Sequence, residues 1–169
     1  MRERLFIFLN NEVVDLSEAK LRANFRAVWP KFLEFEISRS KRCVDVAGSV
    51  NGYLVLQVLA YHNLSLINST VSPNTYEEAR EAWVLSSMDA SLDLPYILNY
   101  AAISELTGLD KETARRAVLK LEKNGWLTVD KKLGINYSPS DENQRLLLEL
   151  NDWELGFLGR LIALTNAPS

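Results

Sequence analysis

The stretch of residues 99–137 constrains the fold of this chain most, because its capping residues and glycines stand where helices must begin and end. Gly108 supplies the positive φ that a tight turn needs. Asp110 is placed to cap the following helix by accepting backbone N–H bonds, and Gly125 is placed to end it in the left-handed conformation. The pattern predicts a helix-turn-helix, with helices over residues 99–106 and 111–124.

The second of these helices has two contrasting faces when its residues are placed at steps of 100°. The small aliphatic face, predicted to lie in the core, holds Ala114, Ala117, Val118 and Leu121. The opposite face and its flank carry Glu112, Arg115, Arg116, Leu119, Lys120 and Lys123. Long cationic side chains suit phosphates and the guanine edge in a DNA major groove. A carboxylate there repels phosphate unless it accepts from a cytosine amino group.

A β-hairpin with a basic tip is predicted directly after this helix. Residues 126–130 favour a strand, Lys131 and Lys132 open a turn, and residues 135–137 favour a second strand. Residues 111–132 hold seven Lys or Arg and three Asp or Glu, a net charge of +4 in a chain of net charge −3. A basic island on an acidic body indicates an anionic partner for this segment.

Residues 102–127 read AISELTGLDKETARRAVLKLEKNGWL and resemble the winged helix-turn-helix of bacterial transcription regulators, above all the MarR-like group. The resemblance implies that Thr113, Arg115, Arg116 and Lys120 face bases or phosphates, and that Lys131 and Lys132 form a wing tip that reaches the adjacent minor groove. The full set of predicted DNA-binding residues is Lys111, Thr113, Arg115, Arg116, Lys120, Lys123, Lys131 and Lys132.

The N-terminal part is predicted to be helical. An apolar stripe formed by Leu21, Phe25, Val28, Phe32 and Phe35 indicates one helix, and Pro30 predicts a kink or a break near Trp29. Residues 40–42 are polar and predict a break between helices. A second helix is expected from about Ser49 to His62, with His62 at its C-terminal end. A third helix is predicted from Thr75, a capping residue, to about Met88. Residues 5–14 fit either a strand or an irregular anchor.

The C-terminal helix after residue 138 is apolar on two sides. One side is predicted to be a seam between two copies of the chain, made of Leu150, Trp153, Phe157 and Leu161. The second side, which includes Leu155, Leu158 and Ile162, is expected to pack on the stripe of residues 21–35. So much apolar surface on one helix implies a second contact, for which a twofold dimer mate is the simplest candidate. The resemblance implies the same pairing of terminal helices.

Enzyme classes find little support in this sequence. It has no Gly-rich phosphate loop, no nucleophile elbow and no His-Glu-x-x-His pattern. One cysteine, Cys43, and one histidine leave little for a metal site. We expect no catalytic residues, no metal and no cofactor. The absence of a signal-like or 18-residue apolar run predicts a cytoplasmic protein without a membrane partner.

The expected fold is therefore mainly α with a small β-hairpin wing: a winged helix-turn-helix with flanking N- and C-terminal helices. The expected segments are 1–72 for packing, dimerisation or sensing, 73–138 for DNA binding, and 139–169 for dimerisation. The expected function is a sequence-specific, double-stranded DNA-binding transcriptional regulator that acts as a homodimer, with any small-molecule effector unknown. The alternatives are a winged-helix protein–protein interaction module and a plasmid or phage replication accessory protein.

Overall fold

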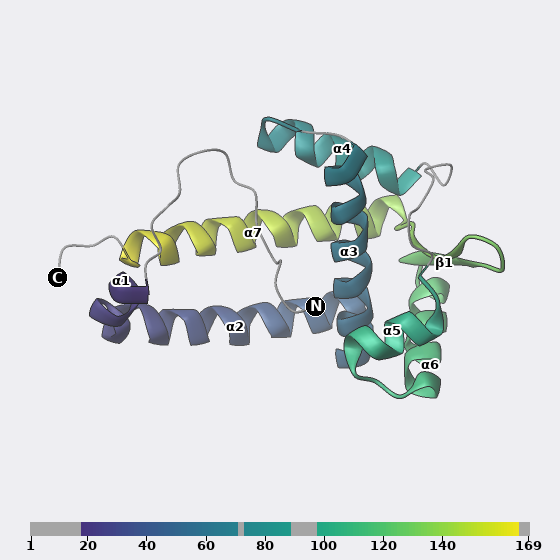
Figure 1. Cartoon of the computed structure of the whole chain (residues 1–169), viewed down its shortest axis with the longest axis horizontal. Helices are drawn as coiled ribbons and strands as arrows, with labels where there is room; N and C mark the ends of the chain where they lie inside the picture. Colours follow the sequence, from purple (N-terminus) through teal and green to yellow (C-terminus); the bar gives the residue numbers. More distant parts are fainter. Residues whose placement is uncertain (1–17, 71–72, 89–97, 166–169) are drawn as a thin grey trace. The chain divides into compact units, whose positions relative to one another are not determined.

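The computed structural model describes residues 18–70, 73–88 and 98–165 and is mainly helical, with one two-stranded antiparallel hairpin (Figure 1). This confirms the expected class at that level. The expectation for residues 5–14 lies outside the described residues. The elements are α1 (Glu18–Ala23), α2 (Phe25–Ala47), α3 (Val50–Thr70), α4 (Tyr76–Met88), α5 (Tyr100–Thr107), α6 (Lys111–Lys123), β1 (Leu127–Asp130), β2 (Gly134–Tyr137) and α7 (Asp141–Thr165).

The chain divides into two compact units that differ from the three expected segments. The helix-pair unit comprises residues 18–37 and 155–165 of the described chain, and the core unit comprises the described residues between 38 and 154. Helices α2 and α7 each contribute residues to both units. No single helix among the described residues is long and apolar enough to cross a membrane; α2 and α3 pass that test only as a pair, bent by 94°.

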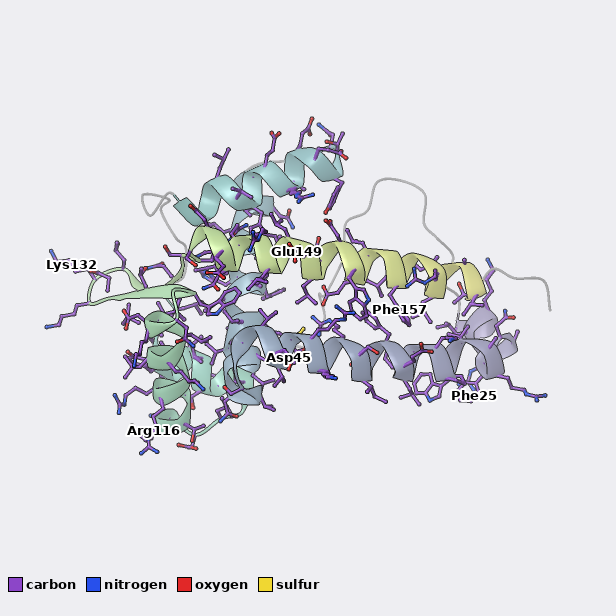
Figure 2. All side chains as sticks on the ribbon, turned by 180° about the vertical axis from the view of Figure 1, so that it is seen from behind. Phe25, Asp45, Arg116, Lys132, Glu149 and Phe157 are labelled. Atoms are coloured by element: carbon purple, nitrogen blue, oxygen red, sulfur yellow. The ribbon has the colours of Figure 1, made fainter. Side chains whose placement is uncertain are left out.

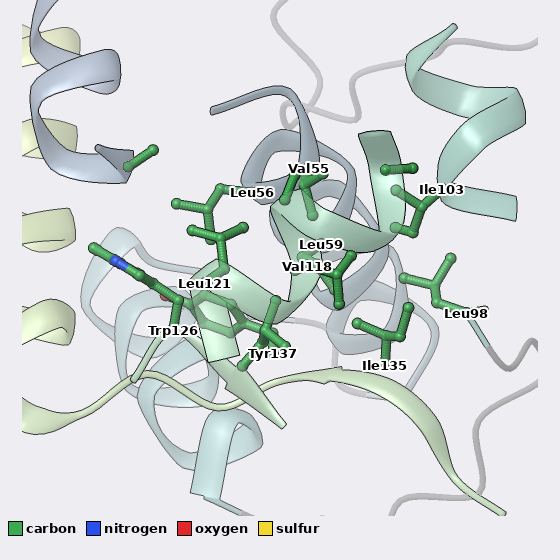
Figure 3. Close-up of a cluster of buried hydrophobic side chains, with 14 residues drawn as sticks. Val55, Leu56, Leu59, Leu98, Ile103, Val118, Leu121, Trp126, Ile135 and Tyr137 are labelled. Carbon is green, nitrogen blue, oxygen red and sulfur yellow. The ribbon is translucent and has the colours of Figure 1, made fainter. Parts of the chain in front are cut away.

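The core unit is built around α3, which packs against α4, α5, α6 and β2. Its most deeply buried large side chains come from four different elements and from the residue that links α6 to β1 (Figure 3). They are Val55, Leu59, Ile103, Val118, Leu121, Trp126 and Leu127. Burying such side chains is worth about 1.5–3 kcal/mol each, so this cluster fixes the position of α6 and the hairpin.

The local signals of residues 99–125 are confirmed. The Asn99 side chain accepts from the Ala102 amide at 3.0 Å and caps α5. Gly108 has a φ of 72°, the left-handed conformation that a residue with a Cβ resists. Asp110 caps α6 by accepting from the amides of Glu112 and Thr113 at 3.1 and 3.0 Å. Each of these signals acts within five residues, which is why the sequence alone predicts them.

Three expectations about the N-terminal helices are wrong. The helix does not break near Trp29, because α2 continues through Pro30 to Ala47 and the break lies at Asn24 instead. The Asn24 side chain ends α1 there by donating to the carbonyl of Lys20 at 3.2 Å. Residues 40–42 lie inside α2, and α3 continues well past His62 to Thr70. Tertiary packing overrides these local stop signals, including the proline.

In the helix-pair unit, the N-terminal half of α2 runs antiparallel to the C-terminal part of α7. The Asn24 side chain donates to the Thr165 carbonyl at 3.3 Å, and the rings of Phe35 and Phe157 lie 5.1 Å apart. Val28 and Phe35 are buried in this contact, each 5% exposed. Two helices in contact bury one stripe of each, so the other sides of both remain open to solvent.

The seam predicted on α7 for a second copy packs inside the chain instead. Phe157 lies against Phe35, and Trp153 lies under the guanidinium of Arg42 with 4.6 Å between the Arg42 Cζ and the ring centroid. Leu150 and Leu161 are partly buried. The side that was expected to pack within the chain is exposed instead, at Leu155, Leu158 and Ile162. The expected assignment of the two sides is therefore reversed over residues 153–162, whereas Leu147 and Leu148, also expected on the inward side, are partly buried. Periodicity locates apolar stripes but does not say which neighbour covers each.

A polar network connects α2, α3 and α7 inside the core unit. The Arg39 Nε lies 2.7 Å from the Glu154 Oε1, with both side chains mostly buried, and Arg39 also donates to the Tyr53 hydroxyl. In the amide orientation that satisfies both neighbours, the Gln57 oxygen accepts from Arg39 and from the Tyr53 hydroxyl. Burial raises the pKa of Glu154, and Arg39 opposes that rise.

Candidate nucleic-acid interface

Helix α6 presents its cationic face to solvent because its small face is fully used in the core. Ala114, Ala117, Val118 and Leu121 are all buried, which confirms the predicted phase of the helix. The helix packs mainly against α3 and α5. Since alanine lacks a long side chain, α6 can lie close to these neighbours while its outer side stays clear.

The predicted DNA-binding residues lie on the exposed side of α6 and at the tip of the hairpin. Figure 2 shows Arg116 on α6 and Lys132 on the hairpin, both with side chains directed into solvent. Exposed among them are Lys111, Arg115, Arg116, Lys120, Lys123, Lys131 and Lys132, whereas Thr113 is partly buried. The structure therefore brings the cationic residues to the surface of one unit.

The carboxylate of Glu112 holds two of these cations. Its Oε2 accepts from the Arg115 Nε at 2.8 Å, and its Oε1 accepts from the Arg115 Nη2 at 2.9 Å. The Arg116 Nε donates to the same Oε1 at 2.8 Å. Hydrogen bonds from Arg115 first, and then from Arg116, lower the pKa of Glu112 to about 2. The predicted groove-facing carboxylate is thus an internal partner of two arginines.

Two further predicted contact residues have partners within the chain. The Lys120 Nζ donates to the Gly48 carbonyl at 3.3 Å, directly after the C-terminal end of α2. A cation at this position is stabilised by the negative end of the α2 helix dipole. Hydrogen bonds from the side chain and the backbone of Thr113 lower the pKa of Asp110. Among the described residues, no carboxylate is within ion-pair distance of Lys111, Lys123, Lys131 or Lys132, which leaves these four ammonium groups open to an anionic partner.

The hairpin turn is organised by an acidic residue that holds its own backbone. Strands β1 and β2 pair antiparallel, with Asp130 opposite Gly134. The Asp130 Oδ1 accepts from the amides of Lys132 and Leu133 at 2.6 and 2.8 Å. These bonds lower the pKa of Asp130. The Asp130 carboxylate therefore binds backbone amides of the turn, and the side chains of Lys131 and Lys132 remain exposed at the tip.

The base of the hairpin is tied to both neighbouring helices. The Trp126 amide donates to the Leu121 carbonyl of α6 at 3.0 Å. The Gly125 carbonyl accepts from the Ser140 amide at 2.7 Å and from the Asn143 side chain at 2.9 Å. The same Asn143 amide donates to the Asn124 carbonyl at 2.8 Å. The end of α6 and the start of α7 are thus held together beneath the hairpin.

Sequence reasoning missed two features of this surface. The contact of Lys120 with Gly48 spans 72 residues, and no local pattern indicates it. Leu133 at the hairpin tip is 47% exposed, and its position in a turn between Lys132 and Gly134 could have suggested this. Leu119, which the phase placed outward, is indeed 37% exposed. Apolar contact groups therefore stand among the cations.

A groove with a volume of about 420 Å³ lies between α4 and α7. Four of its charged lining residues approach one another in pairs: an Arg80 nitrogen lies 3.9 Å from the Asp152 carboxylate, and an Arg145 nitrogen lies 3.9 Å from the Glu149 carboxylate. The Tyr76 hydroxyl also donates to Asp152, at 2.8 Å. Within the described part of the chain, no group of three or more His, Cys, Asp or Glu is placed to hold a metal ion. This groove therefore offers weaker support for a site than the surface of α6 and the hairpin.

Comparison of the chain with models of known protein families, with curated proteins and with solved structures gave no match.

Proposed function

We propose that this chain is a sequence-specific, double-stranded DNA-binding transcriptional regulator that acts as a homodimer through a winged helix-turn-helix. In this proposal α5 and α6 form the helix-turn-helix, α6 is the recognition helix, and the β1–β2 hairpin is the wing. The observation that carries the proposal is the outward cationic face of α6, in the same compact unit as a hairpin whose tip is also basic.

The backbone around α5 supports the winged arrangement. The Ile135 amide of β2 donates to the Leu98 carbonyl at 2.8 Å, so the segment before α5 is joined to the second strand of the hairpin. Leu98 and Ile135 are both buried in the cluster that holds α6. This contact holds the hairpin beside α5 and α6. A wing needs that position if it and the recognition helix are to bind the same duplex.

The surface chemistry supports contact with DNA rather than with a single small anion. Lysines and arginines extend along several turns of α6 and continue on the hairpin tip. Phosphate contacts from such residues position a protein on a duplex, and base-edge contacts from a groove-facing helix add sequence preference. In a homodimer, the two recognition helices would face successive major grooves, about 34 Å apart.

One observation favours a second candidate function, a winged-helix module that binds another protein. Leu119 and Leu133 are exposed beside the cations, and Leu106 at the end of α5 is 63% exposed. The engagement of two arginines by Glu112 also reduces the free positive charge of α6. Apolar groups with partly neutralised arginines would suit an acidic, partly apolar protein surface.

Selection of bound sequences from random duplex DNA by the full chain tests the proposal. We expect enrichment of one sequence family. If about four phosphates are neutralised per subunit, the logarithm of the dimer's affinity should fall with the logarithm of salt concentration at a slope of about −7. A double variant, Arg116→Glu with Lys131→Glu, should abolish this binding.

A matched control reverses a charge away from the proposed surface. Lys41 is an exposed cation on α2, so Lys41→Glu should leave the selected sequence and the salt slope unchanged. Absence of enrichment together with salt-independent binding would contradict DNA recognition by this surface. That outcome would favour the second candidate function, in which the same side chains bind another protein.

A further inference from the structure

The helix-pair unit exposes an unusual amount of apolar surface. On α2, Phe25, Trp29, Leu33 and Ile37 follow one another at intervals of four residues and are 46–71% exposed. On α7, Leu155, Leu158 and Ile162 are 37–45% exposed. The rings of Phe25 and Trp29 stack with their centroids 5.5 Å apart, so the two side chains form one continuous aromatic patch.

The two apolar stripes lie on the same side of the helix pair. Phe35 of α2 and Phe157 of α7 face each other and define the direction of contact. At about 100° per residue, the exposed stripe of α2 is centred roughly 140° from that direction and the stripe of α7 roughly 130° from it. Because the helices run antiparallel, the two rotations lead to the same side. The stripes therefore form one surface, which we call the open face: Phe25, Trp29, Leu33, Ile37, Leu155, Leu158 and Ile162.

The opposite side of the pair has a different character. It carries Lys31 and Glu34 on α2, which form an ion pair at 2.6 Å, and Gly156 and Arg160 on α7. The Arg160 guanidinium lies over the Phe157 ring, 5.3 Å from its centroid, and covers the edge of the contact there. Small and charged residues fit a solvated side, so the two sides of the pair are clearly unequal.

We propose that the open face is the interface with a second copy of this chain, and that two helix pairs join there into a four-helix bundle. At about 200 Å² per large side chain, its seven residues expose on the order of 700 Å². The largest apolar patch of a typical monomer is smaller, at about 300–600 Å². A standard protein interface takes about 800 Å² from each partner. The open face thus has about the area that one partner contributes to a standard interface.

A second copy fits this face because the pair has the form of half a bundle. Four-helix bundles bury an apolar stripe of every helix against two neighbours. Among the described residues of this unit, α2 and α7 are the two long helices, and each packs against the other. A twofold axis through the open face would place the stripes of one copy against the same stripes of the other, an isologous contact. Glu36 lies within the angular span of this stripe, at the end of the unit near Ile37, and its exposed carboxylate would have to stay solvated at that end of the interface.

This inference specifies the homodimer of the proposed function, and it does not depend on DNA binding. It also replaces the seam of Leu150, Trp153, Phe157 and Leu161 with other residues. Sedimentation velocity of the full chain from about 1 to 100 µM tests it. We expect a dimer, and we expect the double variant Leu33→Glu with Ile37→Glu to raise the dissociation constant at least 100-fold.

The variants are chosen so that folding does not confuse the result. Ile37 is 71% exposed and Leu33 46% exposed, so charges there are compatible with a folded subunit, which circular dichroism verifies. Leu85 on α4 is 65% exposed outside the open face, and Leu85→Glu should leave the dimer intact. A wild-type monomer at 100 µM, or equal dissociation constants for the wild type and the double variant, would overturn the proposal.

The same experiment distinguishes a second copy from another segment covering the open face. A wild-type monomer would assign the open face to a different cover, first of all the apolar residues 5–9 of the chain itself, and would reject the second copy. DNA binding by the same sample is measured separately. If the protein is a monomer that still enriches one DNA sequence, DNA recognition stands and the proposed interface is rejected. If it is a dimer that does not bind DNA, the interface stands and DNA recognition is rejected.

Discussion

The guanidinium of Arg116 donates to the carboxylate of Glu112 one helical turn earlier on α6, at 2.8 Å. Arg115 donates to the same carboxylate, so one acidic side chain holds two of the cations that a phosphate would need. Ion pairs at exposed positions are individually weak, because water screens both charges. A phosphate can therefore displace Glu112, but the displacement lowers the net gain of binding.

Replacing Glu112 with glutamine should strengthen binding to DNA of any sequence. The change removes one negative charge from α6 and releases both guanidinium groups. We expect affinity for a random duplex to rise several-fold, as measured by fluorescence anisotropy at fixed salt. Glu77→Gln on α4 makes the same change of charge elsewhere and should have little effect. Unchanged affinity in Glu112→Gln would mean that Arg115 and Arg116 do not contact DNA.

Arg116 and Lys131 should differ in what they contribute. Arg116 stands in the middle of the exposed face of α6, so Arg116→Ala should cost about 1–3 kcal/mol of binding free energy and relax sequence preference. Lys131→Ala at the hairpin tip should weaken all sequences alike and reduce the salt slope by about 1. Binding titrations on matched and mismatched duplexes separate these effects. Equal and small losses for both would argue against α6 in the groove.

Lys120 and Lys123 form a matched pair for separating stability from binding. Both are exposed on α6, but only Lys120 donates to the Gly48 carbonyl. Lys120→Met should lower the free energy of unfolding by about 0.3–1 kcal/mol, the usual value of a cation at a helix C-terminus. Lys123→Met should lower it by less, because both lysines lie in the last turn of α6 but only Lys120 also reaches the C-terminal end of α2. Urea unfolding measures both, and equal stabilities would show that the Gly48 contact contributes nothing.

Truncating Phe157 should destabilise the chain rather than dissociate two copies. Its ring packs against Phe35, which is almost fully buried. Phe157→Ala should therefore lower the free energy of unfolding by about 2–3 kcal/mol, below the roughly 3–5 kcal/mol of fully buried aromatics. Thermal and urea unfolding check the size. A stable variant with weakened self-association would instead restore the seam predicted from the sequence.

Short-range chemistry is what the sequence predicted well. Asn99, Gly108 and Asp110 define their helix ends through bonds or φ values within a few residues, and the structure reproduces all three. The buried face of α6 followed from simple periodicity, because only one phase of the helix collects its small residues. The hairpin strands differed from expectation by one residue at each N-terminal boundary.

Long-range choices could not be predicted in the same way. The polar residues 40–42 look like a break, but α2 continues because Arg39 and Cys43 on either side are held in the interior. Trp153 and Phe157 form a clear stripe, yet nothing local says that α2, and not a second copy, covers it. Such outcomes depend on which surfaces meet after the helices form.

The bonds at the base of the hairpin bear on how freely the hairpin tip can be changed. Since Asn143 and Ser140 bind the Asn124–Gly125 backbone, the two ends of the hairpin stay together whatever lies between them. Exposed loop tips tolerate insertions because their backbone is not needed elsewhere. A change in the length of residues 131–133 would alter the bonds of the Asp130 turn but would leave the ties to α6 in place. The reach of the hairpin is free to diversify while the helix beside it keeps its place.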